Sequence, residues 1–138
     1  MKYLLDTSCW INAVTLPHVL PVRVRRLLQV EEVHYLCSVS LLEAAILFRL
    51  GRMRLDATLS QFFGTALTDD VQLVELSPGI AAATNDLPKT FPGDPFDRTI
   101  VATAIVLELT LITADSAIRQ AGVCSVEYYP FKPSRPGR

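Results

Sequence analysis

Residues 93–107 read Gly-Asp-Pro-Phe-Asp-Arg-Thr-Ile-Val-Ala-Thr-Ala-Ile-Val-Leu, and this stretch predicts a helix with a defined start. Asp94 suits the N-cap, Pro95 the first helical position, and Asp97 the third, where a carboxylate meets free backbone N–H groups. Both aspartates can be explained as capping residues, and we favour that interpretation for Asp94. For Asp97 it is not sufficient, because three other acids stand where their side chains can reach it. These acids are Asp6, Glu43 and Asp115.

The composition indicates one globular domain over residues 1–138, since half of the residues are hydrophobic and a fifth are charged. No segment has the length of a signal-peptide core or a membrane span, so we expect a cytoplasmic protein that does not enter a membrane. The three cysteines form no Cys-x-x-Cys motif, which argues against a disulfide framework or a zinc site. A net charge of −1 does not indicate a general nucleic-acid binder, although metal bound to the four acids would leave a positive remainder.

Short apolar runs alternate with amphipathic segments along the chain. Strands are expected at 2–6, 35–39, 71–76, 109–114 and 126–129. Helices are expected at 9–14, 21–30, 41–50, 56–67, 80–87, 95–107 and 116–121, with an irregular tail at 130–138. The expected N-caps include Thr7 or Ser8, Asp56, and Ser40 in a capping box with Glu43. The alternation indicates βαβ units and an α/β fold with a mostly parallel five-stranded sheet between two helical layers.

The four acids are expected at one edge of this sheet, because ligands of open α/β sheets bind beyond the carboxyl ends of the strands. Asp6 and Asp115 each end an expected strand, while Glu43 and Asp97 each lie in the first turn of a helix. A strand order of 3-2-1-4-5 makes the first and fourth strands neighbours and brings Asp6 beside Asp115. Taken singly, each acid is more simply explained as a cap. Four such acids at one edge favour a shared site.

Such a cluster of acids needs compensation. Two like charges 4 Å apart repel by about 4 kcal/mol at an effective dielectric constant of 20, so four carboxylates must take up protons or cations. Ligand sets made only of oxygen favour Mg²⁺ or Mn²⁺ over zinc. The hypothesis is therefore a divalent-metal site that hydrolyses the phosphodiester bonds of RNA.

Four segments support this hypothesis by their likeness to a known family. They are Leu5-Asp6-Thr7-Ser8, Ser40-Leu-Leu-Glu43, Asp94-Pro-Phe-Asp97-Arg98 and Leu111-Ile-Thr113-Ala-Asp115. In this order, and over nearly the whole chain, they resemble the PIN-domain ribonucleases, above all the VapC-type toxins of toxin–antitoxin pairs. The resemblance implies a PIN-like α/β/α fold and Mg²⁺- or Mn²⁺-dependent endoribonuclease activity. It also implies an RNA substrate, inhibition by a cognate VapB-type antitoxin, and a homodimer.

The resemblance also implies roles for individual residues. The catalytic and metal-binding role falls to four acids: Asp6, Glu43, Asp97 and Asp115. Supporting roles fall to Thr113, to Thr7 or Ser8, to Asp94 as a cap, and to Arg98 as a support or phosphate contact. The sequence departs from the family at Glu108, where relatives usually have Gly. A side chain in a left-handed turn costs about 1 kcal/mol, so the turn is expected to differ locally there.

Three arginines follow the helix that carries Glu43, and they are Arg49, Arg52 and Arg54. They can track RNA phosphates at the mouth of the site, although an ordinary solvated loop explains them equally well. Some apolar side chains can line a groove for an antitoxin helix. Two alternatives stay open: a housekeeping RNA-processing PIN nuclease, and a PIN-like module that binds RNA or protein without catalysis. A phosphoreceiver or a haloacid-dehalogenase-type phosphatase is disfavoured, because both need paired acids after the first strand.

Overall fold

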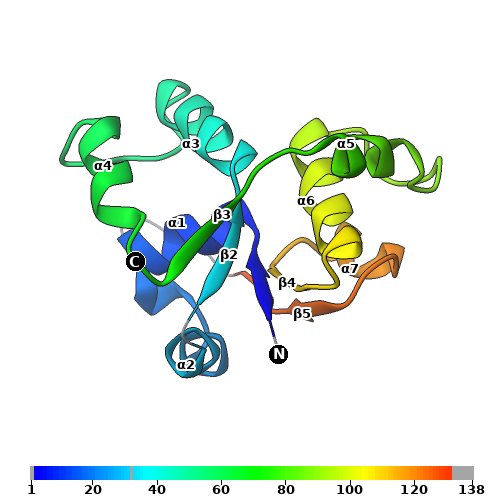
Figure 1. Ribbon diagram of the computed structural model, residues 1–138. Helices are drawn as coiled ribbons and strands as arrows, with labels where there is room; N and C mark the ends of the chain where they lie inside the picture. Colours follow the sequence, from blue (N-terminus) through cyan, green and yellow to red (C-terminus); the bar gives the residue numbers. More distant parts are fainter. Residues whose placement is uncertain (1, 32, 132–138) are drawn as a thin grey trace.

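The sheet is parallel throughout and has the expected strand order. The computed structural model describes residues 2–31 and 33–131, so the expected tail at 130–138 lies, from 132 onward, outside the described residues. The strands pair in the order β3-β2-β1-β4-β5, and every pair is parallel (Figure 1). They are β1 (Tyr3–Leu5), β2 (His34–Cys37), β3 (Val71–Val74), β4 (Thr110–Thr113) and β5 (Val126–Tyr128). The α/β fold predicted from the alternation is confirmed.

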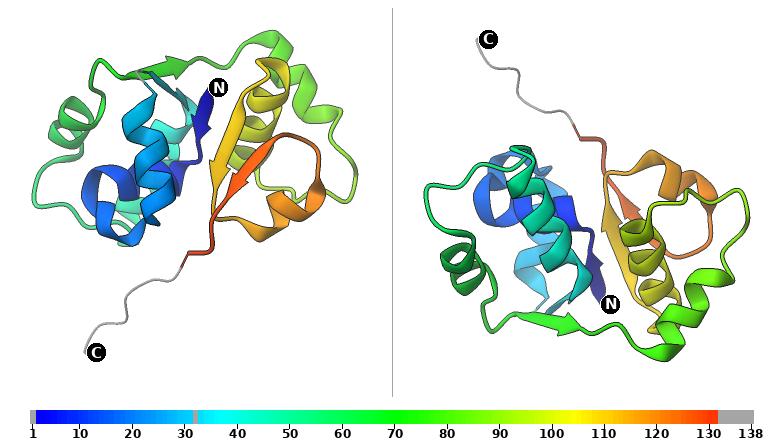
Figure 2. Two further views of the ribbon diagram at one scale, coloured as in Figure 1. Left: turned by 90° about the horizontal axis from the view of Figure 1, so that it is seen from below. Right: turned by 90° about the horizontal axis from the view of Figure 1, so that it is seen from above.

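Helices cover both faces of the sheet, as Figure 2 shows from two sides. They are α1 (Thr7–Thr15), the 3₁₀ helix η1 (Pro17–Val19), α2 (Val22–Val30), α3 (Val39–Arg49), α4 (Leu59–Ala66), α5 (Pro78–Asn85), α6 (Pro95–Val106) and α7 (Ser116–Ala121). None of the helices within the described ranges is long and apolar enough to cross a membrane.

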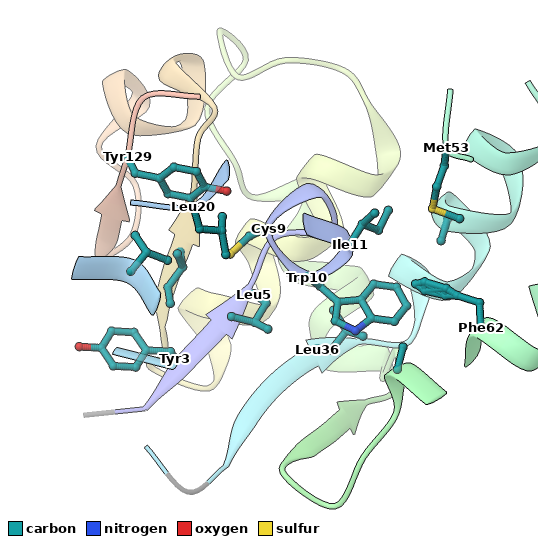
Figure 3. Close-up of a cluster of buried hydrophobic side chains, with 14 residues drawn as sticks. Tyr3, Leu5, Cys9, Trp10, Ile11, Leu20, Leu36, Met53, Phe62 and Tyr129 are labelled. Atoms are coloured by element: carbon teal, nitrogen blue, oxygen red, sulfur yellow. The ribbon is translucent and has the colours of Figure 1, made fainter. Parts of the chain in front are cut away.

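Alternate side chains of β1 serve two separate core clusters. Leu5 packs with Trp10 of α1 and Phe62 of α4 (Figure 3), whereas Leu4 packs with Ile100 of α6 on the other face. Trp10 and Phe62 meet edge to face, with ring centroids 5.5 Å apart. Because successive side chains of a strand point to opposite faces, one short strand joins the two halves of the core.

The register of β1 and β4 positions the two strand-end acids. Leu5 lies opposite Ile112, and the N–H of Asp6 continues this pairing by donating to the carbonyl of Ile112 at 3.0 Å. Asp6 therefore leaves the sheet level with the end of β4, and Asp115 follows two residues after that strand. The prediction that the first and fourth strands are neighbours is confirmed.

Three predicted helix starts are wrong. Ser40 does not open a capping box with Glu43, because α3 already begins at Val39, and Ser40 is buried inside the helix. The helix predicted to start at Asp56 instead begins after Thr58, which forms a capping box with Gln61. Helix α1 is capped by the carboxylate of Asp6 rather than by Thr7 or Ser8.

Of two predictions about local geometry, the first is confirmed. Asp94 caps α6, since its side chain accepts from the N–H groups of Phe96 and Asp97 at 2.8 and 3.0 Å. The second, a locally different turn at Glu108, is wrong, because Glu108 stands between α6 and β4 with a φ of 54°, the left-handed conformation that normally favours Gly. The three cysteines are free thiols, as expected.

Candidate active site

A pocket of about 1080 Å³ opens at the carboxyl ends of β1 and β4 and contains all four expected acids. Asp6 comes from the end of β1, Glu43 from α3, Asp97 from the first turn of α6, and Asp115 from the residues after β4. Acids up to 109 positions apart in the sequence thus line one cavity, as the sheet topology predicted.

Asp6 is the most deeply buried acid of the pocket, with 7% of its surface exposed. Its carboxylate accepts from the hydroxyl of Thr113 at 2.5 Å and from the N–H of Thr7 at 2.9 Å. Burial raises the pKa of Asp6, and these two hydrogen bonds act in the opposite direction. The carboxylate is therefore held in one orientation at the start of α1.

Thr113 connects the ends of β1 and β4. Its hydroxyl donates to Asp6 and accepts from the N–H of Asp115 at 3.0 Å. Asp115 also caps α7, with the N–H of Ala117 donating to it at 2.8 Å. A second hydroxyl bridge joins α1 to α3, where Thr7 donates to Ser40 at 2.8 Å. Thr113 and Thr7 thus brace the backbone around the pocket.

Asp97 and Glu43 carry the clearest signs of unbalanced negative charge. The pKa of Asp97 is raised to about 7, first by burial and then by the nearby carboxylates, of which Asp6 has the largest effect. Burial also raises the pKa of Glu43. The Oε1 atom of Glu43 is buried and has no hydrogen-bond partner among the described residues. A buried oxygen without a donor is costly and is suited to a cation.

The acids share the pocket without forming a finished chelating cluster. Within residues 2–31 and 33–131, no three His, Cys, Asp or Glu side chains are already grouped so that they could hold a metal ion. Asp6 and Asp115 are each engaged by backbone N–H groups, while the unpartnered oxygen belongs to Glu43. Joint coordination of one ion therefore requires side chains of the pocket to rotate inward.

Two expected supporting residues of the Asp-Pro-Phe-Asp-Arg motif, Asp94 and Arg98, lie outside the pocket lining. Asp94 is exposed and caps α6. Arg98 donates to the carbonyls of Thr84, Phe91 and Pro92 at 2.8, 3.3 and 3.3 Å. The guanidinium thus ties the loop between α5 and α6 to the start of the helix that carries Asp97, and its position favours support over phosphate contact.

Of the three arginines after the Glu43 helix, the structure brings two to the pocket. Arg52 and Arg54 line it, together with Ser8, whereas Arg49 ends α3 and is not part of the lining. Asn12 and Phe131 also line the pocket, and neither was among the predicted site residues. Asn12 could have been found as an α1 residue one turn beyond Ser8, but no motif or spacing points to Phe131.

Comparison with known proteins identifies the family. The model of the PIN domain family matches residues 3–123. Ribonuclease VapC22 of Mycobacterium tuberculosis is 45% identical over 53 residues, which cover 38% of this chain and only 41% of that relative's length.

Two solved structures share the fold at 17% sequence identity. One is VapBC2 from Rickettsia felis bound to a promoter DNA fragment, with a TM-score of 0.70 over 93% of this chain and 98% of that one. The other is DNA-bound VapBC from Salmonella typhimurium, with a TM-score of 0.71 over the same shares. The match to the family model spans most of the sequence, and the chain belongs to the PIN domain family.

Proposed function

We propose that this protein is a Mg²⁺- or Mn²⁺-dependent endoribonuclease and the toxin of a VapBC-type toxin–antitoxin pair. The observation that carries the proposal is the shared pocket of Asp6, Glu43, Asp97 and Asp115 at the carboxyl ends of two neighbouring strands. Membership of the PIN family and the partial likeness to a ribonuclease support the choice of RNA as substrate.

The donor set of the pocket fits a hard divalent cation. All four acids offer oxygen ligands, and the buried Oε1 atom of Glu43 has no donor among the described residues. In this proposal Asp6, Asp97, Asp115 and Glu43 hold the ion or ions. A bound divalent cation acidifies a water for attack on phosphorus and stabilises the charge that develops on the phosphate oxygens.

Residues beside the acids orient them and hold the substrate. Thr113 keeps one oxygen of Asp6 pointed toward β4 through its 2.5 Å hydrogen bond. Arg52 and Arg54 supply positive charge at the pocket wall and are suited to bidentate contacts with RNA phosphates. Asp97, with a pKa near 7, takes up a proton in neutral solution more readily than an ordinary aspartate, so metal and protons compete for it.

The toxin assignment rests on the fold and the family. The fold superposes over 93% of this chain on proteins from VapBC complexes, and this likeness supports a VapB-type antitoxin as the natural inhibitor. A homodimer and a cytoplasmic location belong to the same proposal. A housekeeping RNA-processing nuclease is the second candidate, and it shares the same pocket chemistry.

Cleavage of RNA by the purified protein tests the proposal. With Mn²⁺ or Mg²⁺ the parent should cut single-stranded RNA, and excess chelator should stop the reaction. Asp97→Asn should remove most of the activity while keeping the fold, and Asp69→Asn, a change in an exposed turn outside the pocket, should not. A parent that binds RNA but never cuts it with either metal would instead support the non-catalytic module.

Sequencing of RNA ends after induced expression separates the two nuclease candidates. A toxin should produce new ends at few sites and arrest growth, and co-expression of an antitoxin should prevent both effects. Growth at the normal rate with trimmed precursor RNA would favour the housekeeping enzyme.

A further inference from the structure

Phe131 lines the acidic pocket but has no part in the chemistry proposed above. Its side chain is 43% exposed, although it follows a strand and a fully buried residue. A single exposed aromatic side chain is ordinary on a protein surface. Phe131 differs from the other exposed aromatic residue, Phe48, because it lies in the same cavity as Asp6, Asp97 and Asp115.

The position of Phe131 is tied to the residue that organises the acids. Two residues before it, Tyr129 is completely buried (Figure 3), and its N–H donates to the carbonyl of Thr113 at 3.1 Å. The hydroxyl of the same Thr113 holds Asp6 and the N–H of Asp115. Pro130 stands between anchor and ring and restricts the backbone there. The backbone is thus anchored two residues before Phe131, at a short chain distance from the site.

The pocket is larger than a metal ion and a phosphate group require, and part of its lining is apolar. Its volume of about 1080 Å³ is that of a site for a sizeable organic ligand. Besides the acids and two arginines, it contains Ile11, Leu16 and Met53. A metal ion and a phosphodiester use the charged lining, which leaves the apolar lining and the Phe131 ring for another part of the substrate.

We propose that Phe131 is the stacking platform for an unpaired nucleobase next to the phosphodiester that is cut. The inference rests on the proposed ribonuclease function and adds to it a residue that binds the base. Every nucleobase presents a flat face to an aromatic ring, so the contact tolerates many sequences. In a duplex both faces are covered by neighbouring base pairs, so stacking on Phe131 favours RNA whose bases are unpaired.

Kinetics on an unpaired oligoribonucleotide with Mn²⁺ test the platform. Phe131→Ala should lower kcat/KM about 5- to 150-fold, mainly through a higher KM, because an aromatic partner of a base contributes in that range. Phe131→Trp should have the kcat/KM of the parent. Phe131→Leu keeps an apolar side chain but has no ring face, so its kcat/KM should fall as far as that of Phe131→Ala. Phe48→Ala is the matched control, since Phe48 is 37% exposed on α3 and does not line the pocket, and it should cleave like the parent.

A second readout does not depend on turnover. In the Asp97→Asn variant, which should not cut RNA, an oligoribonucleotide carrying 5-iodouridine should crosslink on irradiation to the peptide that contains Phe131, and adding Phe131→Ala should abolish this crosslink. With Asp97 intact, Phe131→Ala should bind Mn²⁺ as tightly as the parent. Cleavage by Phe131→Leu or Phe131→Ala at the parent rate would overturn the inference and leave the proposed function intact. A parent that cuts no RNA would overturn both.

Discussion

Replacement of Asp97 by Asn should stabilise the metal-free protein while removing its response to metal. Asp97 lies in a pocket with three other acids, and its pKa is raised from 3.8 to about 7 by burial and by those charges. Its carboxylate accepts no hydrogen bond within the described ranges, so the amide sacrifices no such contact. Substitution by Asn therefore removes a negative charge that burial and the neighbouring carboxylates destabilise.

The size of the gain follows from the pKa. The difference between 3.8 and about 7 corresponds to about 4 kcal/mol of disfavoured ionisation, which is an upper limit. Because the carboxylate is only partly buried, solvent screening reduces this figure. Asn also loses the favourable interaction between the carboxylate and the start of α6, which lowers the gain by about 0.5 kcal/mol. We expect a net gain of about 1–2 kcal/mol in the free energy of unfolding at pH 8.

Because of Asp97, the stability of the parent should fall as the pH rises from about 4 to about 7. The folded protein binds a proton at Asp97 up to about pH 7, whereas the unfolded chain releases it near pH 4, so stability falls as the pH rises through this window. The advantage of Asp97→Asn should therefore be largest at pH 8 and small at pH 5.

Urea unfolding followed by circular dichroism, in chelator and again in excess Mn²⁺, measures these effects. Mn²⁺ should raise the stability of the parent, and the stability of Asp97→Asn should stay nearly the same with or without Mn²⁺. Asp69→Asn, in an exposed turn, is the control and should match the parent throughout. If Asp97→Asn proved less stable than the parent at pH 8 in chelator, or if Mn²⁺ raised its stability as much as it raises the parent's, Asp97 would not be a strained metal ligand.

Three further changes have expected outcomes. Glu108→Gly should raise the free energy of unfolding by about 1 kcal/mol in urea titrations, because a φ of 54° strains a residue with a side chain, and an unchanged stability would contradict this explanation. Thr113→Val should lower the free energy of unfolding by about 1–3 kcal/mol and weaken Mn²⁺ binding in calorimetry, because buried Asp6 loses its hydroxyl donor; equal affinity would argue against the bridge. Arg52→Ala together with Arg54→Ala should raise KM for RNA without changing kcat. The slope of log KM against log salt concentration should fall by about one for each lost phosphate contact, and an unchanged slope would show that neither arginine contacts the RNA backbone.

The sheet and the acidic pocket could be predicted because each depends on a strong local pattern. Short buried runs ending in Asp6 and Asp115, separated by amphipathic segments, restrict the chain to βαβ units, and the strand order then brings those ends together. The cap at Asp94 was predictable for the same reason, since an Asp-Pro pair before an apolar run has few other structural uses.

What could not be predicted from the sequence depends on contacts between distant segments. Ser40 and Glu43 have the spacing of a capping box, but the helix begins earlier and Ser40 turns inward to meet Thr7. Arg98 stands in a motif beside Asp97, yet its three carbonyl partners lie 6 to 14 positions earlier in the chain. Phe131 reaches the pocket through the anchoring of Tyr129 on β4. No spacing within the sequence indicates these contacts.

The anomalous signal of Mn²⁺ in a crystal structure would show where the acids bind metal. The proposed function predicts a peak in the pocket, with carboxylate oxygens of Asp6, Asp97 and Asp115 coordinating it. A fully ordered pocket with no peak at saturating Mn²⁺, or a peak that touches none of these carboxylates, would contradict it.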